Sequence, residues 1–233
     1  MRLGLGINLM LKNGGGSSAF SPASLPNLAF WYDASQLTLA NNDPVGSFTD
    51  LSGNGRHLVQ ATGSWKPTFL TNRQNGLPAV VSDGTDDRLQ TANFTFNQPK
   101  HIFVVVKENS LGVSPALLDG GSIFEMWTRY TGGNIQMYAG SFGPTSSGID
   151  LTLPHLLEFY WDGANSFIRV DGVTTFTGNP GANNATGLSV FNAPGATEYV
   201  GADLFELFGC TGQVTGANLS AAIAYVQAKW ATP

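Results

Sequence analysis

The chain of 233 residues is 42% hydrophobic but only 12% charged, about half the ~25% of charged residues in ordinary soluble domains. Its 29 glycines and 12 prolines favour a structure rich in turns, and the shortage of charged residues excludes coiled coils and helical bundles. The formal net charge of −5, without a basic cluster, argues against nucleic acid as a partner, and no apolar run approaches the ~20 residues that cross a bilayer.

The first 26 residues differ in composition from the rest of the chain. A glycine–serine linker at residues 14–18 follows a stretch in which apolar residues alternate with others. Period-two spacing places side chains on one face of a strand, and the apolar residues concerned are Leu3, Leu5, Ile7, Leu9 and Leu11. Both a disordered terminus and a docking arm fit this pattern. We favour the arm, a strand that adds to the open sheet edge of another subunit, because a free apolar tail is a liability on a soluble protein.

From Leu28 onward, short β-type runs alternate with turns rich in Gly, Asn, Asp and Pro. Turn sequences such as Asp171-Gly172 supply hairpin chemistry between runs. Many short strands with regular turns are typical of an all-β sandwich or barrel. The clearest predicted strands are His101–Val106, Ile123–Trp127, Ile135–Tyr138, Leu156–Trp161, Phe167–Val170, Val173–Phe176, Leu188–Phe191 and Tyr199–Val200.

One helix is predicted, close to the end of the chain at residues 219–230. Asn218 or Ser220 can cap its first turn. Its apolar stripe should pack the helix against the β-structure, and the residues at helical spacing are Leu219, Ile223, Val226 and Trp230. Trp31, Trp161 and Trp230 are expected in the core, and the single cysteine, Cys210, is expected as a small buried residue.

Five motifs occur in an order that resembles the concanavalin A-like or laminin-G-like jelly-roll domains common in tailed-phage virion proteins and bacterial surface proteins. They are WYDASQLTL (31–39), DLSGNGRHLVQAT (50–62), KPTFL (66–70), NGLPAVVSDGTDDRLQT (75–91) and IFVVV (102–106). The resemblance implies a two-sheet antiparallel jelly roll over residues 27–233, preceded by the arm and linker of residues 1–26. The chain departs from the family pattern at Lys66, where arginine is usual, and at Ser82, where phenylalanine is usual. The leader also resembles those of phage-encoded tail or capsid-associated proteins.

Two local motifs contain carboxylates close together. In the motif at 50–55, Asp50 and Asn54 are expected to bond to the following amides of a glycine turn. Asp83, Asp86 and Asp87 lie within five residues, and Ca²⁺ prefers such oxygen ligands on a loop. The alternative, which we favour because no Asp-x-Asp-x-Asp-Gly run is present, is that these carboxylates cap amides and pair with Arg56 or Arg88. No other cofactor is predicted.

A second hypothesis places a glycan site on a predicted hairpin that mixes aromatic and amide side chains. Sugars stack on flat rings and hydrogen-bond to amides, so one face of this hairpin could form a binding platform; the alternative is that the rings are simply core. The candidate residues are Trp127, Tyr130, Asn134, Gln136 and Tyr138.

No catalytic set is found in the sequence. Jelly-roll glucanases hold two carboxylates ~5–5.5 Å apart on one strand, and none of the five glutamates lies in such a pattern; Glu158 and Asp162 are the nearest pair, with Asp162 in a turn. Nucleophile-elbow, zinc-protease and phosphate-loop motifs are absent as well. We therefore expect a protein that is not an enzyme.

These observations lead to one main functional prediction and one alternative. The main prediction is a structural protein on the virion surface of a tailed phage, a capsid decoration or a tail or fibre module. It would be made in the host cytoplasm, bind other virion proteins through its arm and assemble as a homo-oligomer, with a trimer favoured. The alternative is a surface module that binds host polysaccharide. Neither requires nucleic acid or membrane insertion.

Overall fold

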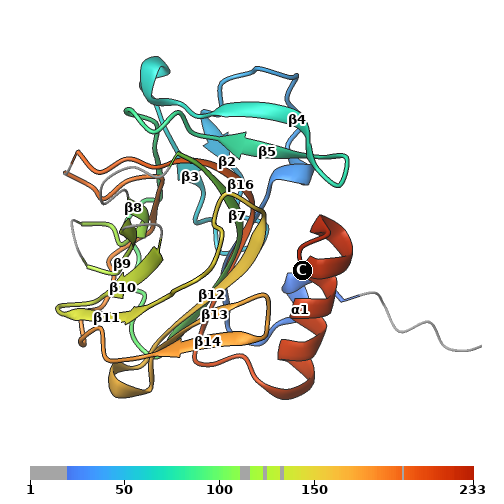
Figure 1. Cartoon of the computed structure of the whole chain (residues 1–233). Coiled ribbons are helices and arrows are strands. Elements are labelled where there is room, and N and C mark those ends of the chain that lie inside the picture. The colour runs from blue at the N-terminus through green and yellow to red at the C-terminus, as the bar shows by residue number, and fades with distance from the viewer. Residues whose placement is uncertain (1–19, 111–115, 123–124, 132–133, 196) are drawn as a thin grey trace, which may run out of the picture.

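The structure, a computed structural model, describes residues 20–110, 116–122, 125–131, 134–195 and 197–233. Within these residues the chain forms two antiparallel sheets of eight strands each, stacked as a sandwich, with helix α1 (Gly216–Trp230) on the outer side of one of them (Figure 1). The predicted all-β sandwich with a C-terminal helix is therefore confirmed. No helix in the described segments has both the length and the hydropathy of a membrane span.

The sheet that α1 covers, sheet A, has the strand order β14-β13-β12-β7-β16-β5-β4, and β1 also pairs with β16. The strands are β1 (Leu28–Asp33), β4 (Thr68–Gln74), β5 (Leu77–Val81), β7 (Lys100–Ser110), β12 (His155–Trp161), β13 (Phe167–Val170), β14 (Thr174–Thr177) and β16 (Gly201–Thr211).

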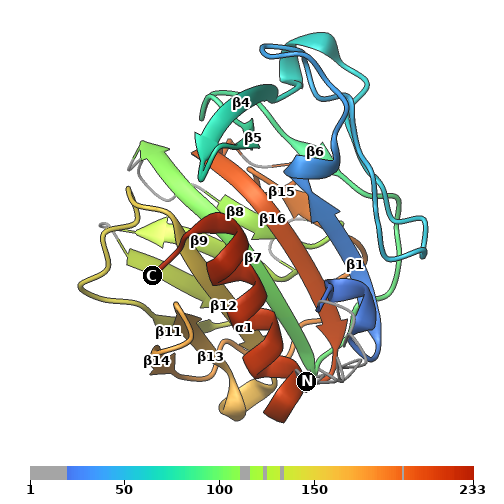
Figure 2. The ribbon, with the colours of Figure 1, turned by 90° about the vertical axis from the view of Figure 1, so that its right-hand side faces the viewer.

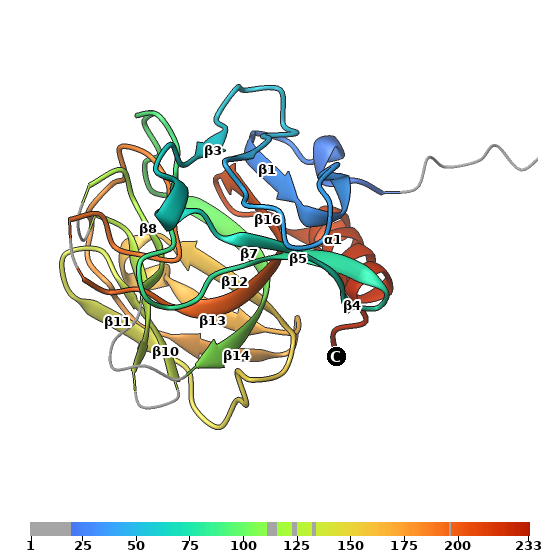
Figure 3. The same ribbon diagram turned by 90° about the horizontal axis from the view of Figure 1, so that it is seen from above.

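The other sheet, sheet B, lies on the side of the molecule away from α1 (Figures 1 and 3) and has the order β11-β10-β9-β8-β15-β6-β3-β2. Its strands are short, and 3-10 turns connect several elements of the fold. The strands are β2 (Ser47–Phe48), β3 (Leu58–Val59), β6 (Leu89–Gln90), β8 (Ala116–Asp119), β9 (Trp127–Thr131), β10 (Asn134–Tyr138), β11 (Phe142–Thr145) and β15 (Ser189–Val190); the turns are η1 (Pro22–Ser24), η2 (Ala34–Gln36), η3 (Gly63–Trp65) and η4 (Gly163–Asn165).

Sheet A separates two apolar layers. Along β7, Ile102, Val104 and Val106 belong to the core between the sheets, whereas Phe103 and Val105 belong to the core under α1. A strand buried on both faces is apolar at successive positions instead of alternating. This explains why the run at 102–106 is continuously apolar.

A bulge in β16 controls which side chains face the helix. The pairing register with β7 shifts between Leu204 and Glu206. Leu204 and Leu207 pack between the sheets, and Phe205 packs under α1, as does the side chain of Glu206 through its hydrogen bonds to the helix. Because a bulge sets two residues opposite one, the side chains of two successive residues, Phe205 and Glu206, both face the helix.

Helix α1 lies across the central strands of sheet A (Figure 2). It begins at Gly216, three residues before the predicted start, and its N-cap is Thr215, whose side chain makes no capping bond; the expected capping by Asn218 or Ser220 is wrong. The predicted stripe does face the sheet, with Val226 and Trp230 fully buried and Leu219 and Ile223 packed against the same core.

Most strand predictions match the structure, but two do not. The strand expected at Tyr199–Val200 begins instead at Gly201 and runs to Thr211. Its first ten residues are all buried, so no alternation of buried and exposed positions marks where the strand begins. The strand expected at Ile123–Trp127 falls partly outside the described residues, and β9 begins at Trp127. In β13 (predicted as Phe167–Val170), Ile168 and Val170 lie in the core between the sheets.

Candidate functional site

Two adjoining hollows open on sheet B near β6. Their volumes are about 390 and 360 Å³, and Arg88 and Gln90 line both of them. Trp65 stands at the first hollow and Tyr199 at the second. We call the two hollows together the Arg88 groove, defined by Trp65, Arg88, Gln90 and Tyr199.

Strand alternation positions the central residues of the groove. Asp87 and Leu89 are buried, and Leu89 belongs to the core between the sheets. Successive side chains point to opposite faces of a strand, so Arg88 and Gln90 point outward. The backbone amide of Arg88 donates to the carbonyl of Trp65 at 3.1 Å, which fixes the end of η3 beside β6.

The guanidinium of Arg88 is held on two sides by aromatic residues. Its Cζ lies 3.8 Å from the centroid of the Trp65 ring, and Nη1 donates to the Tyr199 hydroxyl at 2.8 Å. A guanidinium stacked on an indole gains cation–π attraction and loses little further freedom on binding a ligand. The Gln90 Nε2 donates to the carbonyl of Gly121 at 2.9 Å, so this side chain is fixed as well.

The glycan platform predicted from the sequence lies on β9 and β10. In the register of these strands Trp127 is opposite Tyr138, whereas Tyr130 is opposite the buried Ile135. Asn134, Gln136 and Tyr138 are half-buried on the outer side of β10, and the Tyr138 ring meets Phe142 edge-on at 5.2 Å. The Gln136 amide donates to Thr145 Oγ1 at 2.8 Å. Tyr138 is thus paired with Trp127 and not with Tyr130 across the two strands, and the platform stays a prediction.

The three aspartates predicted as a calcium site do lie together, with one ligand oxygen from each within 4.8 Å of the others. Two of them are already used by the backbone: Asp83 Oδ1 accepts from the Thr85 amide at 2.7 Å and Asp87 Oδ2 from the Asp83 amide at 2.9 Å. Burial, opposed by that amide, raises the pKa of Asp87 to about 6. The oxygen set fits a hard cation, and calcium here stays a prediction.

Amide capping by these aspartates was expected, but their pairing with arginine is not found. Among the described residues Arg56 instead donates to the Ala29 carbonyl at 2.9 Å, and Arg88 bonds to Tyr199. In the turn at 50–55 the prediction for Asp50 is confirmed: its carboxylate accepts from the amides of Ser52 and Arg56, each at 2.9 Å. The prediction for Asn54 is wrong, because its Nδ2 donates to the carbonyls of Leu28 at 2.9 Å and Ala29 at 3.0 Å and so ties the turn to β1.

The carboxylates nearest to a catalytic pattern are engaged elsewhere. Glu158 is fully buried, and its Oε2 forms an ion pair with Arg169 Nη1 at 3.0 Å. His101 Nε2 lies 3.4 Å from the same oxygen. Asp162 accepts from the Tyr160 hydroxyl at 3.2 Å and from Asn165 at 3.0 Å. Cys210 is buried, which raises the pKa of its thiol to about 12 and leaves it unsuited as a nucleophile.

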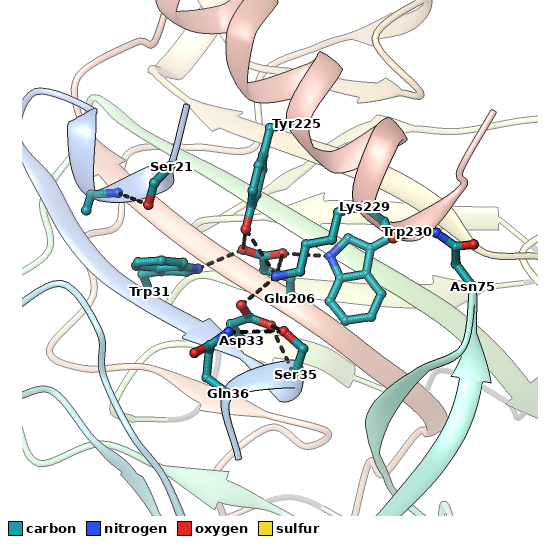
Figure 4. Close-up of polar contacts among 11 residues, drawn as sticks. Ser21, Trp31, Asp33, Ser35, Gln36, Asn75, Glu206, Tyr225, Lys229 and Trp230 are labelled. Atoms are coloured by element: carbon teal, nitrogen blue, oxygen red, sulfur yellow. Dashed lines mark hydrogen bonds and ion pairs between the residues drawn. The ribbon is translucent and has the colours of Figure 1, made fainter. Parts of the chain in front are cut away.

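A dense polar cluster lies under α1 and serves the fold (Figure 4). The buried Glu206 carboxylate accepts from four donors: Trp31 Nε1 at 2.7 Å, Trp230 Nε1 at 2.6 Å, Tyr225 Oη at 3.0 Å and Lys229 Nζ at 3.0 Å. Lys229 also contacts Asp33 at 2.5 Å. Both carboxylates are almost completely buried, so this cluster fastens the helix to sheet A and presents no acid to solvent.

The predicted docking residues Leu3, Leu5, Ile7, Leu9 and Leu11 lie outside the described residues. No sequence motif pointed to Trp65, Gln90 or Tyr199 as site residues, and Arg88 was expected only as a partner for aspartates. Trp65 was the available clue, since it is a tryptophan between polar neighbours that belongs to no predicted strand.

No family model matches the chain, and no curated protein does either. Solved structures do match its fold. Domain 4 of AbnA, an extracellular arabinanase from Geobacillus stearothermophilus solved with arabinotriose, has a TM-score of 0.55 at 17% identity over 85% of this chain and 98% of that domain. The binding domain of Paraclostridial Mosquitocidal Protein 1 has a TM-score of 0.63 at 11% identity over 91% of this chain and 56% of that chain.

A sialidase of Trypanosoma rangeli is also similar, with a TM-score of 0.58 at 11% identity. The match takes in 87% of this chain but only 33% of the sialidase. At these identities the likeness establishes the fold alone. The chain therefore shares a β-sandwich fold with these three neighbours.

Proposed function

We propose that this chain is a non-catalytic carbohydrate-binding domain and that the Arg88 groove is its binding site. The observation that carries the proposal is the groove itself: two connected hollows on sheet B, lined by aromatic rings and by fixed polar groups. Small-ligand sites in proteins are concave, largely apolar and equipped with a few placed polar groups. The arabinanase domain solved with arabinotriose, which shares this fold, supports the same class of function.

The groove has the two kinds of contact that a sugar needs. The rings of Trp65 and Tyr199 offer apolar surface to the C–H faces of a pyranose or furanose. The Arg88 guanidinium and the Gln90 amide offer hydrogen bonds to its hydroxyls. Trp65 and Arg88 also hold each other in place, so little ordering is required on binding.

The test is affinity electrophoresis of purified protein through gels that contain a panel of plant, bacterial and animal polysaccharides. We expect at least one polysaccharide to retard the wild type, and Trp65→Ala to reduce the affinity by about 10-fold or more. Val173→Ala is the matched control, because Val173 is 82% exposed on the turn between β13 and β14 of sheet A. Tyr138→Ala tests the platform predicted on β10.

The outcomes separate the two sites. Loss of binding in Trp65→Ala with normal binding in Tyr138→Ala supports the groove. The reverse pattern would place the site on β9 and β10 and refute the groove. Absence of binding by the wild type to every polysaccharide would refute carbohydrate binding.

The virion role depends on residues 1–18 and stays a prediction. Its support is the alternating apolar leader, and it is compatible with glycan binding by the same protein. Deleting residues 1–18 is expected to abolish incorporation into particles and to leave the β-fold intact. Immunogold labelling of particles with antibody against residues 27–233 would locate the protein on heads or tails, and unlabelled particles would refute the virion role.

A further inference from the structure

Among the described residues Arg88 has no acidic partner, which it shares with Arg56 and which distinguishes it from Arg73 and Arg169 of sheet A. Arg73 pairs with Asp203 at 2.8 Å and Arg169 with Glu158 at 3.0 Å. Within the described part of the chain, no carboxylate lies within 4.0 Å of a nitrogen of Arg88. Its charge is therefore uncompensated in a hollow that is only partly open to solvent.

The guanidinium is nevertheless held in one orientation. The stack on Trp65 fixes its plane, and the bond to Tyr199 uses one of its five N–H groups. The remaining N–H groups form the planar fork that binds a carboxylate or a sulfate with two parallel hydrogen bonds. Because the fork is already oriented, an anion would bind it without the entropy cost of ordering a free arginine.

The other polar groups around Arg88 are mainly donors. The Tyr199 hydroxyl oxygen accepts from Arg88, so its own proton is free to donate outward. The Asn192 carboxamide oxygen accepts from Ser189 Oγ at 2.6 Å, which leaves the Asn192 amide hydrogens as donors beside Tyr199. Gln90 donates to Gly121, so its oxygen is the acceptor for a sugar hydroxyl. A site with a positive charge and several donors suits an anionic group.

The adjacent acidic residue, Asp87, does not pair with this charge. Asp87 is buried, and its carboxylate accepts from the Asp83 amide. The net charge of −5 opposes the approach of any polyanion at long range. Selectivity for an anion would therefore depend on the local contacts with Arg88.

We infer that the Arg88 groove selects acidic glycans, in which a carboxylate or sulfate group on the sugar binds the guanidinium of Arg88 between Trp65 and Tyr199. This inference rests on the proposed carbohydrate binding and names the class of ligand. The two sources of the anion share the same chemistry, and the experiment distinguishes them.

The test compares polysaccharides that differ only in charge. Polygalacturonate and its methyl ester form one pair, and dextran sulfate and dextran form the other. Dissociation constants are measured by calorimetry at low and at 0.15 M salt for wild type, Arg88→Gln, Arg88→Lys and the control Val173→Ala. We expect wild type to prefer the charged member of at least one pair by about 10-fold or more, and Arg88→Gln to remove that preference. Arg88→Lys should keep only part of it, since lysine lacks the fork.

Each result has a defined meaning. Equal binding of charged and neutral polymers by wild type would overturn the selectivity and leave carbohydrate binding in place. Charge preference that persists in Arg88→Gln would overturn the role of Arg88. A wild type that binds none of these polymers or the wider panel would refute the proposed function itself. If Arg88→Gln unfolds, Tyr199→Phe is used instead; it keeps the ring, releases Arg88 and is expected to reduce the preference by about 3-fold or more.

Discussion

Replacing Lys229 with methionine tests whether the polar cluster under α1 stabilises the fold through its charge. Lys229 Nζ lies 2.5 Å from Asp33 Oδ2 and 3.0 Å from Glu206 Oε2, and its side chain is 17% exposed while the two carboxylates are nearly inaccessible. Methionine keeps most of the apolar length of lysine. The variant therefore removes the one cation that faces both acids in this cluster of described residues.

The expected cost is about 3 kcal/mol at pH 7. Removing one partner of a buried ion pair costs roughly 3–5 kcal/mol, and the lower end applies because Glu206 keeps three donors from Trp31, Tyr225 and Trp230. For a chain of this size the corresponding fall in Tm is about 8 °C. Urea unfolding followed by tryptophan fluorescence and by circular dichroism measures the loss.

The loss should shrink as the pH falls. Burial and Asp33 raise the pKa of Glu206 above its ordinary value of 4.5, and Lys229 opposes this effect, so the variant raises that pKa further. A carboxyl whose folded pKa is raised destabilises the fold above its unfolded pKa and ceases to do so once both states are protonated. The difference between variant and wild type is therefore largest near pH 7 and smaller towards pH 4.5.

Lys66→Met is the matched control, because Lys66 has no ion pair within the described residues, and a change within about 0.5 kcal/mol is expected. A loss below about 1 kcal/mol in Lys229→Met at pH 7, or a loss that stays constant down to pH 4.5, would refute the electrostatic reasoning.

Four further predictions concern stability and a cation. The Glu108 carboxylate is buried with no hydrogen-bond partner among the described residues, and burial raises its pKa to about 8. The free energy of unfolding of the wild type should therefore fall by up to about 5 kcal/mol between pH 4.5 and pH 9. Glu108→Gln should not show this fall, and the same pH dependence of unfolding in both proteins would contradict the assignment. A Cβ at Gly209 would lie 2.4 Å from Phe30 Cζ, so Gly209→Ala should destabilise by about 1–3 kcal/mol in urea unfolding; an unchanged midpoint would show that the ring can move. Ala231 ends α1 with φ of 50°, so Ala231→Gly should raise stability by about 0.5–1 kcal/mol, and a lower Tm would oppose this. If Ca²⁺ binds the three aspartates with a Kd of about 1 mM, 10 mM CaCl₂ should raise the Tm of the wild type by about 4 °C. Asp86→Asn should abolish this rise. An equal rise in wild type and variant, or an equal rise of the wild type in MgCl₂, would exclude a specific calcium site.

The elements whose side chains repeat with the period of a strand or a helix were predictable from the sequence. The alternation in β13, the continuous apolar run of β7 and the helical stripe of α1 each depend on periods of two or 3.6 residues. The glycine turn at Asp50 was predictable for the same reason, since its hydrogen bonds join residues two and six positions apart. Such short-range relations persist whatever the rest of the chain does.

The candidate site depended on long-range contacts that no local pattern encodes. Arg88 meets Trp65 from 23 positions away and Tyr199 from 111 positions away. The bulge in β16 likewise directs Glu206 towards Trp31, 175 residues earlier in the chain. By itself the sequence determined the β-sandwich class and the helix, because burial periodicity is a local property. Only the tertiary structure decided which loops of the two sheets lie side by side. It therefore decided that Arg88, which has no acidic partner in the described part of the chain, lies between two aromatic rings at the surface of sheet B.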